Sequence, residues 1–485
     1  MKKFWVFALL SCLVLCGAAV WLGALNQDEG WYLYAAKMVG EGKVLYRDFA
    51  YTQGPLMPIV YSAFVWIWDS WGILGARVFT VLIGLAGIAF AVALASRTCG
   101  EEKNRRGFAA LAVFMLLGCN LYHLYYLAIP KTYALASLFL AIGFFLLSLA
   151  EERRRFIVPA AAALAFAAGV RISLGAVPAV VGVSLLFRRR WADAALFALG
   201  GGIALALIYG PFVFDPATRE GFLAAQRYHA ARGGGDIVWT IGSLSRLVRW
   251  YLPAFILLGM GFTARVSPFT RTIGLSFAAV FAVQIAAPFP YEDYQVPVMS
   301  LLTVYAAAKF AGSSTALPLA PWRPALLALG LACGCSFGSP LLEKWTTNGQ
   351  DRFWTLRKEK PELAQLRDVA ARIEAMDPGG CDLLTQDLYL AVETGRRVPA
   401  GLEMGPFATL SDEEWRRLLG SAPCRIAALS GYSFAIEPPV CGERPVEKQM
   451  EFWSILKKRY RLAGREEMFG QNATTLIILE RNPGR

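Results

Sequence analysis

Two adjacent carboxylates, Asp28 and Glu29, follow the first apolar segment of the chain in the stretch LNQDEGWYLYAAKMVGEG. A carboxylate held beside a hydroxyl group can take its proton and so make the oxygen a nucleophile. The same two residues could instead be ordinary acids of a helix N-terminus, where negative charge is favourable. The dense aromatic residues after the pair and the GPLMP turn further on favour a site. The sequence therefore predicts Asp28 and Glu29 as catalytic residues.

Four basic residues lie inside apolar runs or at their ends: Lys131, Arg171, Arg77 and Arg249. A charge at membrane depth is costly, so such a residue either has a function or extends its side chain to the surface. A cation at headgroup depth could stabilise the negative charge of a phosphate leaving group. We predict these four residues as phosphate contacts, and the alternative of extended surface side chains stays open.

A second acidic pair, Glu292 and Asp293, lies in the turn YEDYQ. It could bind a substrate or, with Asp28, a divalent cation, although a plain polar turn explains it equally well. Only two histidines and no CxxC pair are present, so no zinc site is predicted. The residues predicted to contact substrate are Tyr32, Tyr51, Gln53, Glu292, Asp293 and Tyr294.

The composition predicts that membrane helices position these side chains. The chain has 485 residues, of which 56% are hydrophobic, and its mean hydropathy is +0.44. This apolar content, arranged in long runs, is typical of a polytopic α-helical membrane protein. We expect about eleven transmembrane helices, at residues 4–25, 72–96, 107–128, 132–150, 156–170, 173–187, 193–213, 246–263, 272–289, 296–311 and 324–341.

Basic clusters in the short loops predict the orientation, because such loops stay on the cytoplasmic side. Lys2 and Lys3, residues 97–106, residues 153–155 and residues 188–190 all fall on one side of the expected spans. The N-terminus is therefore expected in the cytoplasm, and the Asp28 loop and the YEDYQ turn on the outer face. The net charge of +12 follows from this topology and is no nucleic-acid signal.

Charge also predicts a division near residue 341. Residues 1–341 carry 27 basic and 15 acidic residues, whereas residues 342–485 carry 21 of each. We predict a transmembrane domain over 1–341, with a first external loop at 26–71, and an extracytoplasmic α/β domain over 342–485. Within that domain we expect helices at 361–376, 411–420 and 447–460, and strands at 381–387, 425–431 and 474–480.

The three cysteines of the expected outer domain could form one disulfide bond. An oxidising compartment would permit a single bond among Cys381, Cys424 and Cys441, with Cys381 and Cys424 as one pairing.

The layout of the first loop resembles that of the GT-C glycosyltransferases. A first span, then Asp-Glu, an aromatic helix, and a YTQGPL segment before a second helix is similar to the branch that contains protein O-mannosyltransferases and lipid A aminoarabinose transferases. The Pro-led late span YEDYQVPVMSLLTVYAA and the C-terminal α/β domain extend the resemblance over most of the chain.

The resemblance implies inverting transfer of a sugar from a polyprenyl-phosphate-linked donor to a lipid, glycan or protein acceptor, on the outer face of the inner membrane. It places the role of base, or of orienting the acceptor, on Asp28. The aminoarabinose transferases carry an Arg soon after the acidic pair and a Lys-Pro before the second helix, whereas this chain has DEGWY and TQGP. The identity of the sugar donor therefore stays open.

Two other classes of function remain open on the sequence alone. A lipid or glycan transporter would also place Lys131 and Arg171 in the membrane, but it would not need a large outer domain or an aromatic first loop. A non-catalytic envelope assembly protein would tolerate replacement of its acidic residues.

Overall fold

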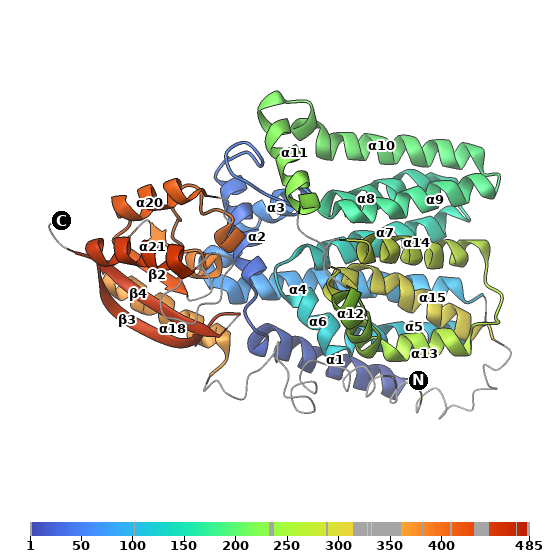
Figure 1. Ribbon diagram of the computed structural model, residues 1–485. Helices are drawn as coiled ribbons and strands as arrows, with labels where there is room; N and C mark the ends of the chain where they lie inside the picture. The colour runs from blue at the N-terminus through green and yellow to red at the C-terminus, as the bar shows by residue number, and fades with distance from the viewer. Residues whose placement is uncertain are drawn as a thin grey trace. The chain divides into compact units, whose positions relative to one another are not determined.

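The structure, a computed structural model, describes residues 2–100, 102–231, 237–287, 290–313, 360–380, 382–407, 410–430, 446–471 and 473–482, with 327 and 331. It forms two compact units, each of which we describe by itself (Figure 1). Unit 1 comprises Met1–Val20, Thr52–Met57 and Thr80–Asp351, and unit 2 comprises Trp21–Tyr51, Pro58–Phe79 and Arg352–Arg485.

Unit 1 is built from packed helices. Neighbours in the bundle include α7 with α8, α8 with α10, and α14 with α9 and α15. The helices that lie wholly in this unit are α5 (Lys103–Gly118), α6 (Leu121–Ala128), α7 (Thr132–Ala150), α8 (Ile157–Val170), α9 (Ala176–Phe187), α10 (Trp191–Val213), α11 (Pro216–Ala231), α12 (Ile237–Trp250), α13 (Leu252–Met260), α14 (Pro268–Ile285) and α15 (Met299–Ala311), with the 3-10 helices η1 (Arg154–Phe156), η2 (Ile172–Gly175) and η3 (Glu292–Val298). Two further helices, α1 (Lys2–Leu22) and α4 (Val65–Thr98), have residues in both units.

Among the described residues, five helices are long and apolar enough to cross a membrane: α1, α4, α7, α10 and α14. The number rises to seven if α5 with α6, bent by 66°, and α12 with α13, bent by 77°, each count as one span. The polytopic architecture is supported, but the expected count of eleven is not confirmed. Helices α8, α9 and α15 have 14, 12 and 13 residues, which at 1.5 Å per residue is shorter than a hydrocarbon core of about 30 Å. The expected span at 324–341 lies outside the continuously described ranges.

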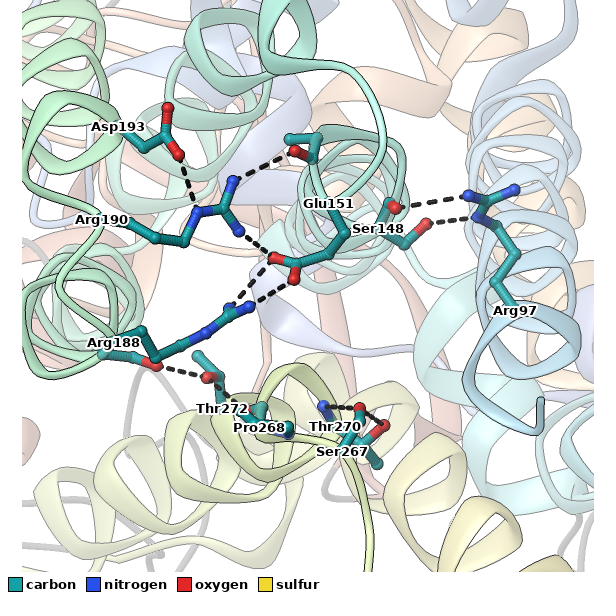
Figure 2. Close-up of polar contacts among 12 residues, drawn as sticks. Arg97, Ser148, Glu151, Arg188, Arg190, Asp193, Ser267, Pro268, Thr270 and Thr272 are labelled. Atoms are coloured by element: carbon teal, nitrogen blue, oxygen red, sulfur yellow. Dashed lines mark hydrogen bonds and ion pairs between the residues drawn. The ribbon is translucent and has the colours of Figure 1, made fainter.

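The basic clusters that predicted the cytoplasmic side form ion pairs in unit 1 (Figure 2). Glu151 Oε1 accepts a hydrogen bond from Arg188 Nη1 at 3.0 Å, and Arg190 Nε donates to Asp193 Oδ2 at 2.7 Å. Arg97 Nε donates to Ser148 Oγ at 2.9 Å. The contacts of Glu151 with Arg188 and of Arg97 with Ser148 join neighbouring helices, whereas Arg190 and Asp193 both lie at the start of α10. All are partly open to solvent, where an ion pair adds little stability.

Unit 2 holds two short helices of the first loop, α2 (Gln27–Gly40) and α3 (Leu56–Ser62), although the first residues of α3 belong to unit 1. A helix after Asn26 was predicted, and α2 confirms it. The contacts group most of the first loop with the C-terminal residues in unit 2, and the predicted domain division stays a prediction. The predicted boundary at 341 lies outside the described residues.

The C-terminal part of unit 2 is an α/β structure. Its four-stranded sheet has the order β1-β2-β4-β3, and only β1 and β2 pair in parallel. The five residues of β2 are all buried, as expected for a central strand. The strands are β1 (Leu383–Leu384), β2 (Ile426–Ser430), β3 (Tyr460–Phe469) and β4 (Thr474–Arg481), and the helices are α18 (Glu362–Met376), α19 (Leu388–Glu393), α20 (Asp412–Ser421) and α21 (Val446–Arg459), with η4 (Gly405–Phe407).

The predicted helices and strands of this region coincide with observed elements, but β3 and α19 were not predicted. Strand β3 is an edge strand whose sequence YRLAGREEMF is mostly exposed, so it lacks the apolar signal of the others. Cys424 is buried. Cys381 and Cys441, with which it could pair, lie outside the described residues.

Candidate active site

Asp28 lies in the first turn of α2, in unit 2. The helix begins with a capping box: Asn26 Oδ1 accepts from Asp28 N at 3.0 Å, and Asn26 N donates to Glu29 Oε1 at 2.8 Å. Such reciprocal bonds satisfy backbone groups that the helix itself cannot pair. Asp28 is half-buried and lies at the N-terminus of this helix.

Glu29 and Arg77 form a fully buried ion pair. Arg77 Nε donates to Glu29 Oε2 at 2.7 Å and Nη2 donates to Oε1 at 2.6 Å. The same guanidinium donates to the carbonyls of Gly23 and Ala24, each at 2.9 Å, just beyond the end of α1. Both side chains are 0% exposed. The pair therefore holds the turn between α1 and α2. The catalytic role of Glu29 and the phosphate contact of Arg77 stay predictions.

The aromatic residues of the first loop form a cluster in unit 2. The ring centroids of Trp31 and Tyr51 lie 5.3 Å apart, those of Tyr32 and Tyr51 6.1 Å, and those of Tyr46 and Tyr51 6.2 Å. Tyr32 and Tyr51, predicted to contact substrate, are 2% and 0% exposed. The structure thus places both in the packing that shapes the loop.

Gln53 belongs to the TQGP turn, in unit 1, and is half-buried. At the next residue, Gly54, an added Cβ would lie 2.2 Å from the carbonyl oxygen of Gly169. Only glycine permits this approach. The turn is therefore held against the end of α8, immediately before Arg171.

Lys131, Arg171, Asp293 and Tyr294 meet in unit 1 around one residue that the sequence did not single out, Tyr133. Lys131 Nζ lies 3.2 Å from Asp293 Oδ2, and Tyr133 Oη donates to the same oxygen at 2.9 Å. The Arg171 guanidinium lies 5.0 Å from the ring centroid of Tyr133 and 5.1 Å from that of Tyr294. We call these five residues the cation cluster.

Breaks between helices position the cation cluster. Lys131 is the N-cap residue of α7, and Arg171 stands between α8 and η2, where its Nη1 donates to Thr132 Oγ1 at 3.0 Å. Lys131 is 6% and Arg171 8% exposed. Two cations and one carboxylate are thus held in a buried, aromatic setting, a combination suited to an anionic ligand.

The two acids of YEDYQ have different partners. Asp293 joins the cation cluster, whereas Glu292 Oε2 accepts hydrogen bonds from Ser243 Oγ at 3.3 Å and from Arg246 Nη2 at 3.2 Å. Within the described part of the chain, no group of three or more His, Cys, Asp or Glu side chains could hold a metal ion. The divalent cation predicted at Asp28, Glu292 or Asp293 stays a prediction.

Arg249 lies on α12 with its guanidinium 4.5 Å from the ring centroid of Trp250. Its contact with phosphate stays a prediction. The sequence missed Tyr133, although its place two residues after Lys131 in PKTY was a usable signal.

No protein-family model matches the sequence, and no curated protein matches it. Solved structures do match. A crystal structure of ArnT from Cupriavidus metallidurans bound to undecaprenyl phosphate is similar with a TM-score of 0.66, at 16% identity over 99% of this chain and 98% of that one. The apo state of the same protein matches equally, with a TM-score of 0.66.

The Archaeoglobus fulgidus oligosaccharyltransferase, in complex with Zn and sulfate, is similar with a TM-score of 0.53, at 11% identity over 94% of this chain and 72% of that one. Both proteins are GT-C glycosyltransferases. This chain has the GT-C fold. The predicted resemblance is thereby confirmed at the level of the fold.

Proposed function

We propose that this protein is an inverting glycosyltransferase that moves a sugar from a polyprenyl-phosphate-linked donor to a lipid, glycan or protein acceptor. It would act as a multi-pass protein of the inner membrane, on the outer face, with its N-terminus in the cytoplasm and the C-terminal α/β domain outside. The GT-C fold supports the reaction class, and the cation cluster is the observation that carries the proposal.

The cation cluster would stabilise the negative charge of the donor phosphate. When the bond between the anomeric carbon and the phosphate oxygen breaks, that oxygen keeps the electron pair and the lipid phosphate leaves with increased negative charge. Lys131 and Arg171 would stabilise this charge, and their low exposure strengthens the attraction. A fold relative was solved with undecaprenyl phosphate bound, which supports a ligand of this class.

Asp28 would take the proton of the acceptor hydroxyl. A hydroxyl oxygen that attacks the anomeric carbon must lose its proton, and a carboxylate is the group to receive it. Attack from the side opposite the phosphate gives inversion. Glu29 cannot easily share this task because both of its oxygens bind Arg77.

The test compares cells that lack the protein with cells complemented by wild type or by Asp28→Asn. Mass spectrometry of envelope glycolipids, glycans and glycoproteins should show a sugar that only wild type restores. A general base contributes about 10²- to 10⁴-fold to the rate, so Asp28→Asn should leave almost no product. Glu41→Gln, at the exposed end of α2, is the matched control and should behave as wild type.

Other outcomes would favour the other classes of function. Full restoration by Asp28→Asn would reduce this residue to a helix-terminal acid. An envelope whose sugars are unchanged when the protein is lost would favour transport or assembly over sugar transfer.

A further inference from the structure

The helix that carries Asp28 lies against the C-terminal α/β structure of unit 2, and contacts follow it from end to end. Gln27 N donates to Gln471 Oε1 at 2.8 Å, Tyr34 Oη accepts from Val398 N at 3.0 Å, and Lys37 Nζ donates to Gly395 O at 3.0 Å. The partners of α2 therefore come from a segment more than three hundred residues later in the chain.

The closest approach is at Gly30. A Cβ at this position would lie 1.9 Å from Tyr389 N and 2.4 Å from the carbonyl carbon of Leu388, both backbone atoms of α19. Backbone atoms cannot rotate aside as a side chain can, so any larger residue would force the two helices apart. Glycine inside a helix costs about 1 kcal/mol relative to alanine, so its presence here needs the close contact as a reason.

Gly30 and Asp28 lie on opposite sides of α2. Two residues correspond to about 200° of rotation around a helix, so a helix face turned toward α19 at Gly30 turns Asp28 away from it. The C-terminal segment thus supports the back of α2, and the distance between α2 and α19 sets how far Asp28 projects.

Helix α19 also contacts α4. Glu393, the last residue of α19, accepts a hydrogen bond from Ile73 N at 2.8 Å, beside Gly72, where the chain has a φ of +62°. Burial raises the pKa of the Glu393 carboxyl. One six-residue helix therefore contacts both α2 and the kink of α4 at Gly72.

We propose that α19 is a positioning element, and that its contact with Gly30 sets the place of Asp28 for catalysis. This inference rests on the proposed function, because it takes Asp28 as the base. A misplacement of a catalytic group by 1 Å can cost about a hundredfold in rate, so the tight packing at Gly30 should control kcat.

The main test is Gly30→Ala with Gly40→Ala as its control. Both change a glycine of α2, but a Cβ at Gly40 would come no closer than 3.3 Å to the Val65 side chain and 3.5 Å to the carbonyl oxygen of Ser62. Gly30→Ala should lower kcat about a hundredfold and leave KM for the polyprenyl-phosphate-sugar donor unchanged, and Gly40→Ala should retain wild-type values. Wild-type kcat in Gly30→Ala would overturn the inference.

A second pair of variants covers the case that Gly30→Ala does not fold. Gln471 is exposed, so Gln471→Ala should fold; it removes the acceptor for Gln27 N, one residue before Asp28. It should lower kcat without changing KM, and Gln471→Glu, which keeps an acceptor oxygen, should restore it. A role in stability alone would lower the amount of folded protein and leave kcat per molecule unchanged, which would contradict the inference.

Hydrogen exchange separates this inference from the proposed function, because it needs no substrate. Amides of α2 and α19 should exchange faster in Gly30→Ala than in Gly40→Ala or wild type. If Asp28→Asn keeps full transfer while exchange still rises, the packing of α2 on α19 holds, but the proposed role of Asp28 fails and its positioning for catalysis fails with it. If Asp28→Asn is inactive and Gly30→Ala changes neither exchange nor kcat, the positioning role fails by itself.

Discussion

In unit 2, Arg77 gives its guanidinium nitrogens to two carboxylate oxygens of Glu29 and to two backbone carbonyls, at 2.6 to 2.9 Å. In unit 1, Arg171 donates to the hydroxyl of Thr132 and lies between the rings of Tyr133 and Tyr294. Both arginines interrupt apolar sequence, and the sequence predicted the same role for both.

The difference lies in what a new anion would have to displace. Binding of a phosphate by Arg77 would break a bidentate ion pair and leave Glu29 as a buried charge, at high cost. The contacts of Arg171 with a hydroxyl and two aromatic rings are of a kind that suits a guanidinium for an anionic ligand. Arg77 is therefore suited to holding structure and Arg171 to binding a ligand.

The largest expected effect is on stability, from Arg77→Met. Removal of one partner of a buried ion pair costs about 3–5 kcal/mol, because the other charge remains buried. The free energy of unfolding of unit 2, measured in detergent with denaturant, should fall by this amount. The double variant Glu29→Gln/Arg77→Met should recover part of the loss.

A double-mutant cycle in unit 1, matched to that of Arg77 and Glu29, tests the comparison of the two regions directly. The distance of 3.2 Å between Lys131 and Asp293 is longer than the 2.6 and 2.7 Å between Arg77 and Glu29, so the coupling energy of Lys131→Met with Asp293→Asn should be smaller. Equal coupling energies in the two cycles would contradict the division into a structural and a ligand-binding arginine.

Asp387 sharpens the comparison, because it is a buried acid of unit 2 whose contacts include a hydroxyl and no cation that the structure describes. It is 2% exposed, and Tyr389 Oη donates to its Oδ1 at 3.1 Å. Burial raises the pKa of its carboxyl from 3.8 to about 6. The folded form then binds the proton more tightly than the unfolded form, so this contribution to stability is full below about pH 4 and is lost as the pH rises through about 6.

The loss can reach about 3 kcal/mol, since one pKa unit corresponds to about 1.4 kcal/mol. Asp387→Asn should remove it, so the unfolding free energy of the full chain should change less between pH 4 and pH 8 than in wild type. Asp382→Asn, an exposed position just before β1, is the control and should keep the wild-type pH dependence. A wild-type slope in Asp387→Asn would show that another group is responsible.

Lys131 and Arg171 of the cation cluster could be predicted because a charge in an apolar run is conspicuous. Asp293 was chosen as part of the acidic pair in YEDYQ, and the structure brings the three residues together. The same rule chose Arg77, but its partner Glu29 lies 48 residues away in the sequence, and nothing local distinguishes a saturated ion pair from an accessible cation.

The contact of α2 with α19 could not be predicted either, because its residues are also far apart in the sequence. Gly30 is one of 45 glycines, and its function depends on Tyr389, which reaches it only in the folded chain. Local signals did suffice for α2 itself, since Asn26 and the acid three residues later are a recognisable capping box. Helix boundaries follow from local sequence, and the distances between helices do not.

The smallest expected effect tests the ligand-binding side of the comparison, with Arg171→Lys. Lysine keeps the charge but lacks the planar group that stacks between the Tyr133 and Tyr294 rings and donates from several nitrogens at once. KM for the polyprenyl-phosphate-sugar donor should rise about tenfold, which equals about 1.4 kcal/mol, with little loss of stability. Arg249→Lys makes the same change beside Trp250, so it compares the two predicted phosphate contacts directly. A larger rise in KM for Arg249→Lys than for Arg171→Lys would move the phosphate site from the cation cluster to α12.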